Sequence, residues 1–520
     1  MDTAIPIIDL FAGPGGLGEG FSALGRKSGK ACFKIGLSVE KDPHAHSTLE
    51  LRSFVRQFPY DNISEDYYAF LRDEITRDQL FERNSVEAAA AREEAWHATL
   101  GTGEKFDDDL DHRIEKVLKG NDRWVLIGGP PCQAYSVIGR ARRSRDAENL
   151  DYLPENDERN YLYIEYLRII ARHKPAVFVM ENVKGLLSST VQGERVVDYI
   201  FADLRKPSTV FPDYGNAEYQ IFSIVKNSDP DSSGKYQLKP KDFIVECEKY
   251  GIPQARHRVI LLGIRKDFKG LSPEILETTN EIPAGAVLDG LPVLRSGLSK
   301  EADSPESWKQ RLEEALERRW LSGARRRHGQ ELEDILSEVL GGIALPSDDR
   351  GGKYIRCNAQ VRDDLKWWYH DPLLEGITNH ASRGHMIKDI HRYMFAACFS
   401  RIKGRSPKLQ DFPADLQPDH VNAGSGHFDD RFRVQIAEKP STTITSHISK
   451  DGHYYIHPDP YQCRSLTVRE AARLQTFPDN YYFCGNRTQQ YAQVGNAVPP
   501  LLAFKIAKIV KNIIDKMDHG

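Results

Sequence analysis

The stretch IPIIDLFAGPGGLG, residues 5–18, joins a short apolar run to a glycine-rich turn. Gly13, Gly15 and Gly18 match the pattern G-x-G-x-x-G, and acidic Glu40 closes the next apolar run, about 20 residues beyond the turn. A strand, a glycine turn and a helix in this order are typical of α/β folds that hold an adenosine cofactor at the carboxyl ends of parallel strands. This pattern alone fits a nicotinamide dinucleotide and S-adenosylmethionine equally well.

Three more apolar runs continue the pattern through the first half of the chain: WVLIGG before Pro130, AVFVMENV from Ala176 and RVILLGI from Arg258. Their alternation with helical stretches predicts an α/β fold with a mainly parallel, Rossmann-like sheet and helices on both faces. We expect residues 1–265 to form this domain. Within it, a charged, Ala- and Glu-rich stretch at about 66–122 predicts inserted surface helices with no chemical role.

The regular alternation ends near Lys266. Residues 266–438 mix Gly and Pro breaks with clusters of Arg and His, which predicts a second domain that is smaller and irregular. Residues 439–520 regain regularity, and a predicted helix after Pro500 carries an apolar face. We expect that C-terminal helix to return to the first domain.

Composition limits the classes of partner. With 71 Lys and Arg against 75 Asp and Glu, the 520-residue chain has a net charge of −4, so a nucleic acid would have to be met by local basic patches. The seven cysteines form no C-x-x-C pair and the histidines have no regular ligand spacing, so we expect neither a disulfide framework nor a metal site. We find no secretory leader pattern or bilayer-length apolar run in the sequence, and therefore expect a cytoplasmic protein with no membrane association.

A second motif, GGPPCQ at residues 128–133, directly follows the run WVLI. Two glycines and two prolines shape the backbone around one cysteine at the end of a strand, which is how a nucleophile is presented to a crevice. The plainer alternative is a small buried side chain, but that role requires no such turn. The sequence therefore predicts an exposed thiol at Cys132.

Two further strand ends carry charge. Glu181 closes AVFVM and would lie beside Cys132 if the two strands are neighbours, where a carboxyl group can carry a proton to a ring nitrogen. In QARHR, residues 254–258, a spacing of two places Arg256 and Arg258 on one face of an extended segment, where they suit a carbonyl oxygen or a phosphate. Taken singly, a carboxylate that caps a turn and a solvated arginine pair are the simpler interpretations.

In this order, the motifs resemble those of the DNA (cytosine-5)-methyltransferase family. DLFAGPGGLGEGF resembles its first motif, GGPPCQAYS its nucleophile motif, ENV its acid motif and QARHRV its paired-arginine motif. RSLTVREAARLQTFPD and QVGNAVPPLL resemble its last two motifs. The resemblance implies an S-adenosylmethionine-dependent methyltransferase sheet in residues 1–265, a target recognition domain at 266–438 and the last two motifs at 439–520.

The resemblance also implies roles for individual residues. Cys132 would add to C6 of cytosine, Glu181 would act at N3 and Arg258 at O2, while Arg256 would support the loop or a phosphate. S-adenosylmethionine would donate the methyl group and leave as S-adenosylhomocysteine, without a metal. Its expected contacts are Phe11, Gly13, Gly15, Gly16, Glu40, Asn62, Ile63, Pro131, Leu162, Asn496 and Val498. Asn62 stands where the family commonly has Asp, and its amide oxygen can still accept from the adenine amino group.

Double-stranded DNA is the substrate that the resemblance implies, with the target cytosine flipped out of the duplex. Gln133, Ser136 and Asn182 are the expected substrate contacts, and RARRSR at residues 140–145 would face phosphates. Candidates for phosphate and base contacts in the recognition region are Arg318, Arg319, Arg325, Arg326, Arg327, Trp367 and Trp368, and the sequence does not show which of them read bases.

We expect a modification enzyme of bacterial restriction-modification type that acts as a monomer, with a restriction endonuclease for the same site as its partner. Two alternatives stay open. A tRNA cytosine-5 methyltransferase is disfavoured by the large region between QARHRV and LTVREAARLQ, and a non-catalytic DNA-binding homologue by the presence of Cys132, Glu181 and the glycine turn. A nicotinamide-dependent dehydrogenase would leave the Pro-Pro-Cys turn and the Glu-Asn-Val strand end unexplained.

Overall fold

The computed structural model describes residues 4–131, 162–191, 194–227, 238–317, 319–417 and 430–517. At its centre, five parallel strands lie in the order β3 (Ala95–His97), β2 (Phe33–Glu40), β1 (Ile5–Leu10), β4 (Val125–Gly128) and β5 (Val177–Val183). The sheet continues with β11 (His257–Arg265), which runs antiparallel to β5, β8 (Tyr219–Phe222) and β9 (Ile244–Glu246). The strand order reverses at β1, which has β2 on one side and β4 on the other. A crevice therefore forms at the carboxyl ends of these strands.

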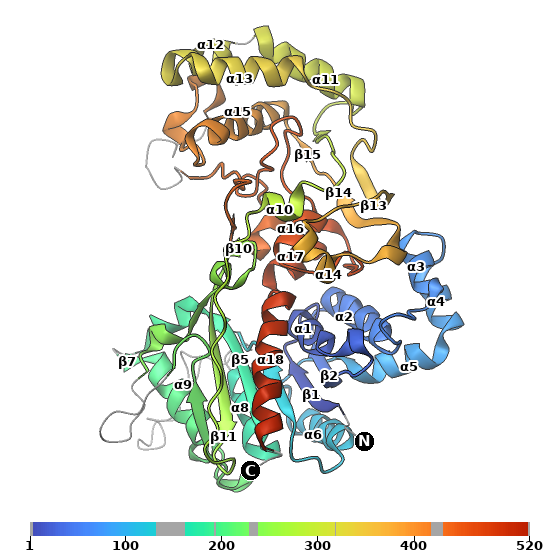
Figure 1. Ribbon diagram of the computed structural model, residues 1–520, viewed down its shortest axis with the longest axis vertical. Coiled ribbons are helices and arrows are strands. Elements are labelled where there is room, and N and C mark those ends of the chain that lie inside the picture. The colour runs from blue at the N-terminus through green and yellow to red at the C-terminus, as the bar shows by residue number, and fades with distance from the viewer. Residues whose placement is uncertain are drawn as a thin grey trace.

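Helices cover both faces of this sheet (Figure 1). On one face, α1 (Gly16–Ala23) and α18 (Pro500–Met517) pack over Ile7 and its neighbours. On the other face, α6 (Glu104–Leu118), α8 (Leu162–His173) and α9 (Val196–Arg205) pack over Ile8 and its neighbours. Successive strand side chains point to opposite faces, so the apolar run of β1 supplies both cores. The expected α/β fold with helices on both faces is confirmed.

The C-terminal helix α18 lies against α1, at the other end of the sequence (Figure 1). A Cβ atom on Gly20 of α1 would lie 2.4 Å from the backbone nitrogen of Phe504 and from the carbonyl oxygen of Pro500. Only a glycine permits this approach of the two helices. The preceding helices, α16 (Val468–Leu474) and α17 (Arg487–Asn496), are thereby held next to the glycine turn of β1.

The stretch expected to contain only surface helices also contributes a strand to the sheet, so that prediction is wrong in part. After α2 (Pro43–Arg56), it forms α3 (Glu65–Leu71), α4 (Arg77–Arg83) and α5 (Ser85–Glu94), and then β3 pairs in parallel with β2. A three-residue strand between two charged helices is too short to show a period of two in sequence. The sequence therefore did not predict β3.

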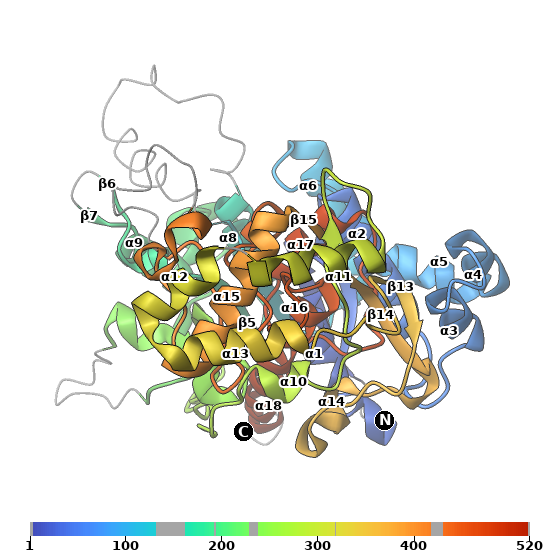
Figure 2. The same ribbon diagram turned by 90° about the horizontal axis from the view of Figure 1, so that it is seen from above.

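Residues 266–438 are more regular than expected. Four helices, α11 (Pro305–Glu313), α12 (Arg319–His328), α13 (Gln330–Gly341) and α15 (Ile387–Lys403), form a helical unit with its own core. Figures 1 and 2 together show this unit stacked above α16 and α17. In α12, the apolar side chains Trp320, Leu321 and Ala324 stand among arginines in RWLSGARRRH, so the helical period is hidden by charge.

Not all of that region belongs to the helical unit. The short helix α14 (Lys366–Tyr369) joins the core built by the C-terminal helices, and the hairpin of β13 (Gly351–Arg356) and β14 (Gly376–Ala381) has a small core of its own and contacts α16 through β14. The indole of Trp368 donates to the Thr476 carbonyl oxygen at 2.7 Å, and Trp367 packs against Phe504 of α18. Both tryptophans, which were candidates for nucleic-acid contacts, thus anchor α14 to the C-terminal part of the chain.

The arginines of α12 are also engaged in part within the helical unit. Arg327 donates to the Phe412 carbonyl oxygen and Arg325 pairs with Glu333, while Arg318 lies outside the described residues. No helix in the described parts of the chain is long and apolar enough to cross a membrane.

Candidate functional site

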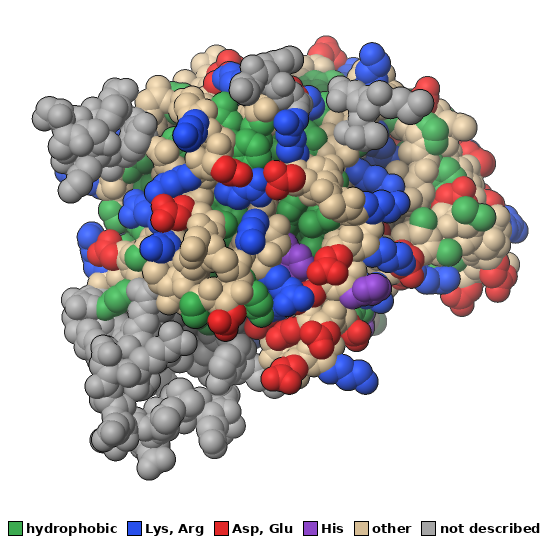
Figure 3. Space-filling model, turned by 90° about the horizontal axis from the view of Figure 1, so that it is seen from below, with side chains coloured by type: hydrophobic (Ala, Val, Ile, Leu, Met, Phe, Trp, Pro, Cys, Tyr) green, Lys and Arg blue, Asp and Glu red, His purple; other side chains and the backbone are tan. Residues whose placement is uncertain are grey.

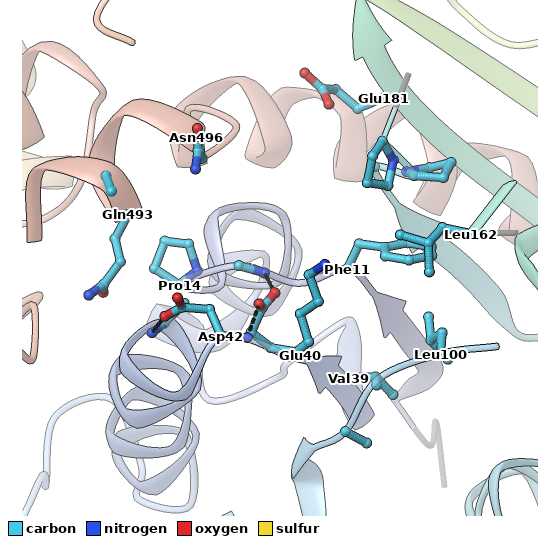
Figure 4. A pocket seen from close by; sticks show the side chains of 18 of the residues that line it. Phe11, Pro14, Val39, Glu40, Asp42, Leu100, Leu162, Glu181, Gln493 and Asn496 are labelled. Carbon is cyan, nitrogen blue, oxygen red and sulfur yellow. Dashed lines mark hydrogen bonds between the residues drawn. The ribbon is translucent and has the colours of Figure 1, made fainter. Parts of the chain in front are cut away.

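The carboxyl ends of the parallel strands enclose a cavity of about 620 Å³ (Figure 4). Phe11, Leu100 and Leu162 gather on one side of it, opposite Gln493 of α17. A largely apolar cavity with a few convergent polar groups is the usual form of a small-molecule site. Of the expected residues, those that line it are Phe11, Gly13, Glu40, Pro131, Leu162, Glu181, Asn182 and Asn496.

Glu40 ends β2 with its carboxylate turned to the backbone of two turns. It accepts from the amide of Gly13 at 2.8 Å and from the amide of Asp42 at 2.7 Å (Figure 4). Burial raises the pKa of Glu40, and these two amides offset part of that rise. A carboxylate has about four acceptor positions, so Glu40 can hold the glycine turn and still accept from a ligand hydroxyl.

The glycine turn divides into a part that faces the cavity and a part that packs behind it. Gly13 has φ +59° and lines the cavity, whereas a Cβ on Gly16 would lie 2.3 Å from the Val498 carbonyl oxygen. Gly15 has φ +98° and lies under the hydroxyl of Tyr481. The structure therefore corrects the assignment of Gly15, Gly16 and Val498 as cofactor contacts, since they bring the C-terminal motif up against β1.

Asp9 lies beneath this turn and is fully buried. Burial raises the pKa of its carboxyl group to about 8, although the nearby Arg56 guanidinium acts in the opposite direction. A Cβ on Gly18 would lie 3.1 Å from Asp9 Oδ2, so the carboxyl group packs directly against α1. Asp9 is therefore a titratable support of the turn and does not line the cavity.

The Pro-Pro turn after β4 is fixed by the neighbouring strand. Asn182 on β5 is buried, donates its side-chain amide to the Pro130 carbonyl oxygen at 2.8 Å and accepts from the Val183 amide at 2.9 Å. The Asn182 side chain therefore holds the turn that precedes residue 132. The sequence had predicted a substrate contact for it. Pro131 lines the cavity next to it.

Glu181 and Arg258 form the charged rim of the site. Arg258 Nε lies 2.9 Å from Glu181 Oε1, and both side chains are less than 15% exposed, at 13% and 14%. In the antiparallel register Glu181 faces Ile260 and Val183 faces Arg258, so the two charged side chains are diagonal neighbours on one face of the sheet. Arg258 of the arginine motif therefore meets the strand-end acid, while the expected neighbour of Glu181, Cys132, lies outside the described residues.

Arg256 does not line the cavity, and its contacts are of the loop-supporting kind that the resemblance implies. Its guanidinium is buried and donates to the carbonyl oxygens of Ile444 at 2.8 Å and Ala497 at 2.9 Å, with longer bonds to Gly495. Burial lowers the pKa of Arg256 to about 9. These contacts fasten the end of α17, which carries Asn496, to the start of β11.

Asn62 and Ile63 do not reach the cavity. Asn62 is exposed, and Ile63 packs in a separate core under α2 and α3. The matching wall is formed by Ala98 and Leu100, in the segment that follows β3. The resemblance matched Asn62 to the family's adenine-contacting Asp, whereas α3, α4 and α5 lie between residue 62 and β3; the short AWH run was the signal for the true position.

The nucleophile motif itself is only partly described. Cys132, Gln133, Ser136 and the basic run 140–145 lie outside the described residues, and the description stops at Pro131. Among the described residues, no group of three or more His, Cys, Asp or Glu side chains is arranged to hold a metal ion.

Comparisons with known proteins address the resemblance directly. A family model described as C-5 cytosine-specific DNA methylase matches residues 88–206 and 218–512. Type II methyltransferase M.Bpa9945I of Bacillus paralicheniformis is 31% identical over 528 residues, which cover 98% of this chain and 99% of that protein. Type II methyltransferase M.DdeI of Desulfomicrobium norvegicum is 28% identical, with 96% of this chain and 87% of that protein covered.

A relative from an archaeon, the DNA (cytosine-5-)-methyltransferase M.ApeKI of Aeropyrum pernix, is 27% identical over 76% of this chain and 83% of its own length. The family model spans more than half of the chain, and the Bacillus relative is matched along nearly its whole length. The resemblance drawn from the motifs is confirmed. The chain belongs to the C-5 cytosine-specific DNA methylase family and is a DNA (cytosine-5)-methyltransferase.

Proposed function

We propose that this chain flips a cytosine out of double-stranded DNA and transfers a methyl group from S-adenosylmethionine to its C5 atom, in one sequence context. The observation that carries the proposal is the Glu181–Arg258 pair, which stands at the rim of the cavity beside the turn that leads to Cys132. An acid and a guanidinium beside the turn that precedes a cysteine in the sequence match the needs of cytosine, whose C5 is too weak a nucleophile to react without activation.

The cavity suits the proposed cofactor. Its volume of about 620 Å³ lies within the range of ligand sites. Glu40 keeps acceptor positions for ribose hydroxyls, the apolar wall of Leu100 and Leu162 suits an adenine ring, and Phe11 and Asn496 face the remaining space. When bound there, S-adenosylmethionine supplies an electrophilic methyl group.

In the proposed mechanism, the Cys132 thiolate forms a bond to C6 of the flipped cytosine. Negative charge then develops on the ring at O2 and N3, where Arg258 donates to O2 and Glu181 holds a proton at N3. C5 thereby becomes able to attack the methyl group. A base then removes the C5 proton, the bond from C6 to sulfur breaks, and 5-methylcytosine returns to the duplex.

The biological setting is part of the same proposal. The relatives from Bacillus paralicheniformis and Desulfomicrobium norvegicum are both named Type II methyltransferases, which supports a role for this chain as a cytoplasmic modification enzyme beside a restriction endonuclease that acts on the same site. A single cavity that takes one flipped base requires only one copy of the chain, so we propose a monomer.

The test is to incubate the protein with tritiated S-adenosylmethionine and plasmid DNA, total tRNA or no nucleic acid. Cys132→Ser should abolish label in DNA, whereas Cys357→Ser, at a half-buried cysteine outside the cavity, should not. Bisulfite sequencing should map the label to cytosines in one repeated context. Label in tRNA alone would contradict the proposal, and so would transfer that survives Cys132→Ser.

A further inference from the structure

Three arginines from separate parts of the chain gather at the start of α17. Arg383 lies just before β15 (Gly384–His385), and its guanidinium carbon is 4.1 Å from the ring centre of Tyr491. Tyr491 follows Arg487 by one turn of α17, so the Arg383 guanidinium lies along the helix face that begins with Arg487. Arg350 donates to the carbonyl oxygen of Ser382 at 3.4 Å and thus adjoins Arg383. We call Arg350, Arg383 and Arg487 the arginine cluster.

The arginine cluster holds an excess of positive charge. Arg350 pairs with Asp303 at 2.9 Å. Arg295 also pairs with Asp303, at 2.6 Å, but has a second carboxylate partner in Asp349, so the charge of Arg350 is balanced. Within the described parts of the chain, Arg383 and Arg487 have no carboxylate in ion-pair range. Burial lowers the pKa of Arg487, and the Arg383 and Arg350 charges add to this effect. Arg383 donates to the Ile448 carbonyl oxygen, but neither Arg383 nor Arg487 has an anion that would balance its charge among the described residues.

The position of the cluster relates it to the reaction. Thr488 and Gln489, the two residues after Arg487, line the cavity, and the same helix carries Asn496 at its other end. Figure 2 shows β15 and α17 together, beneath the helical unit. By contrast, the end of the molecule seen in Figure 3 intersperses basic with acidic side chains. Unbalanced arginines thus occur at the rim of the cavity, on the side of the helical unit.

We propose that the arginine cluster binds phosphates of the DNA strand that passes the cavity and so sets the duplex in register for flipping. The proposal rests on the proposed function, because it takes DNA as the substrate. Arginine presents a planar fork of donors that matches phosphate oxygens, and phosphate contacts fix register without reading sequence. The cluster would therefore act on duplexes of any sequence, as a positioning element apart from the catalytic residues.

Salt dependence of binding tests this role. Binding of a fluorescein-labelled duplex of mixed sequence is measured by anisotropy over a series of KCl concentrations. Each lost phosphate contact should lower the slope of log K against log [KCl] by about 0.9. Arg487→Gln changes an exposed side chain, and we expect that loss of slope. Arg383→Gln should give the same loss, whereas Arg383→Lys keeps the charge and should largely keep the slope.

Two controls separate the outcomes. Arg205→Gln, at an exposed arginine that ends α9, should leave the slope unchanged, and every variant should bind S-adenosylhomocysteine as the wild type does in the absence of DNA. Unchanged slopes for both Arg487→Gln and Arg383→Gln would overturn the proposal, as would a loss confined to one DNA sequence, which would indicate base reading. If the wild type transferred no methyl group, the proposed function would fail, while the slopes would still decide the role of the cluster.

Discussion

Arg258 Nε lies 2.9 Å from Glu181 Oε1, and the two side chains stand on diagonal positions of the antiparallel strands β5 and β11. In the proposed mechanism the pair acts on O2 and N3 of one flipped base, which requires that both partners be held on a rigid sheet. Each side chain would then have two tasks: it binds the base, and it orients the other.

The first prediction concerns this pair. Glu181→Gln should lower the single-turnover rate of methyl transfer by about 10²–10⁴-fold, and Arg258→Met by about 10²–10³-fold. The double variant should lose less than the product of the two, because each single change already disables the unit. Glu218→Gln, which breaks an exposed pair with Lys266 at the far end of β11, should leave the rate unchanged. Losses that multiply would show that the two groups act independently.

The second prediction tests the corrected cavity wall. Leu100→Ala removes apolar surface that faces the cavity, so S-adenosylhomocysteine should bind about tenfold more weakly in a titration calorimeter. Asn62→Ala, at the exposed position that the sequence comparison had favoured, should leave the affinity unchanged. A melting curve for both variants controls for stability, since Leu100 also contributes to a core. Equal affinities for the two variants would restore the original assignment.

The third prediction concerns Asn182. Asn182→Ala frees the Pro130 carbonyl oxygen and so loosens the turn that precedes Cys132. The rate of methyl transfer should fall by about 10²-fold, because a small misplacement of a reacting group is costly, while S-adenosylhomocysteine affinity should stay the same. Single-turnover kinetics beside calorimetry would separate the two effects. A parallel loss of cofactor affinity would mean that Asn182 contacts the cofactor side of the cavity.

Sequence could predict what depends on long local runs. The apolar runs of β1, β4 and β5 were recognisable in the sequence, so the sheet could be predicted. Glu181 and Arg258 stand at the ends of such runs, so the charged rim could be predicted as well. The resemblance to a known family then supplied the order of the motifs, although it could not say which matched residues line the cavity.

The errors arose where the outcome depends on packing between distant segments. Asn62 was assigned from its position after β2, but the crossover holds four helices and the wall is built by Leu100. The spacing predicted that Arg256 and Arg258 share one face. Instead, the Arg256 guanidinium is buried and donates to the carbonyl oxygens of Ile444 and Ala497. Nothing local in the chain marks either contact. The same holds for Trp368, whose partner Thr476 is 108 residues away.

The fourth prediction compares three glycines. Gly13→Ala and Gly120→Ala each place an alanine at positive φ in open space, so each should lower the free energy of unfolding by about 1–2 kcal/mol. Only Gly13 lines the cavity, so only its variant should also bind S-adenosylhomocysteine more weakly. Gly16→Ala should cost more than either, because its Cβ would lie 2.3 Å from the Val498 carbonyl oxygen and the backbone must move. Denaturant titrations would rank the three, and an equal cost at Gly16 and Gly120 would contradict the close approach.

The fifth prediction concerns pH and Asp9. Burial raises the pKa of its carboxyl group to about 8, whereas in the unfolded chain it titrates near 3.9. Between about pH 4 and pH 8 the folded protein holds a proton that the unfolded chain has released, so this group makes stability fall as pH rises through that window. Asp9→Asn stays neutral and has nearly the same shape. The free energy of unfolding of Asp9→Asn minus that of the wild type should therefore increase as pH rises, by up to about 1.4 kcal/mol per pH unit.

Urea titrations at several pH values across that window would measure the difference, with Asp198→Asn as the control at an exposed ion pair. A difference that stays flat with pH would mean that Asp9 is ionised in the folded protein. In that case the nearby Arg56 guanidinium, which already opposes the effect of burial, would have to balance the carboxylate beneath the glycine turn. A rising difference would instead show that the carboxyl group of Asp9 is protonated in the folded protein. The turn should then loosen in alkaline solution, and cofactor affinity should fall above about pH 8. Asp9→Asn should remove that loss of affinity.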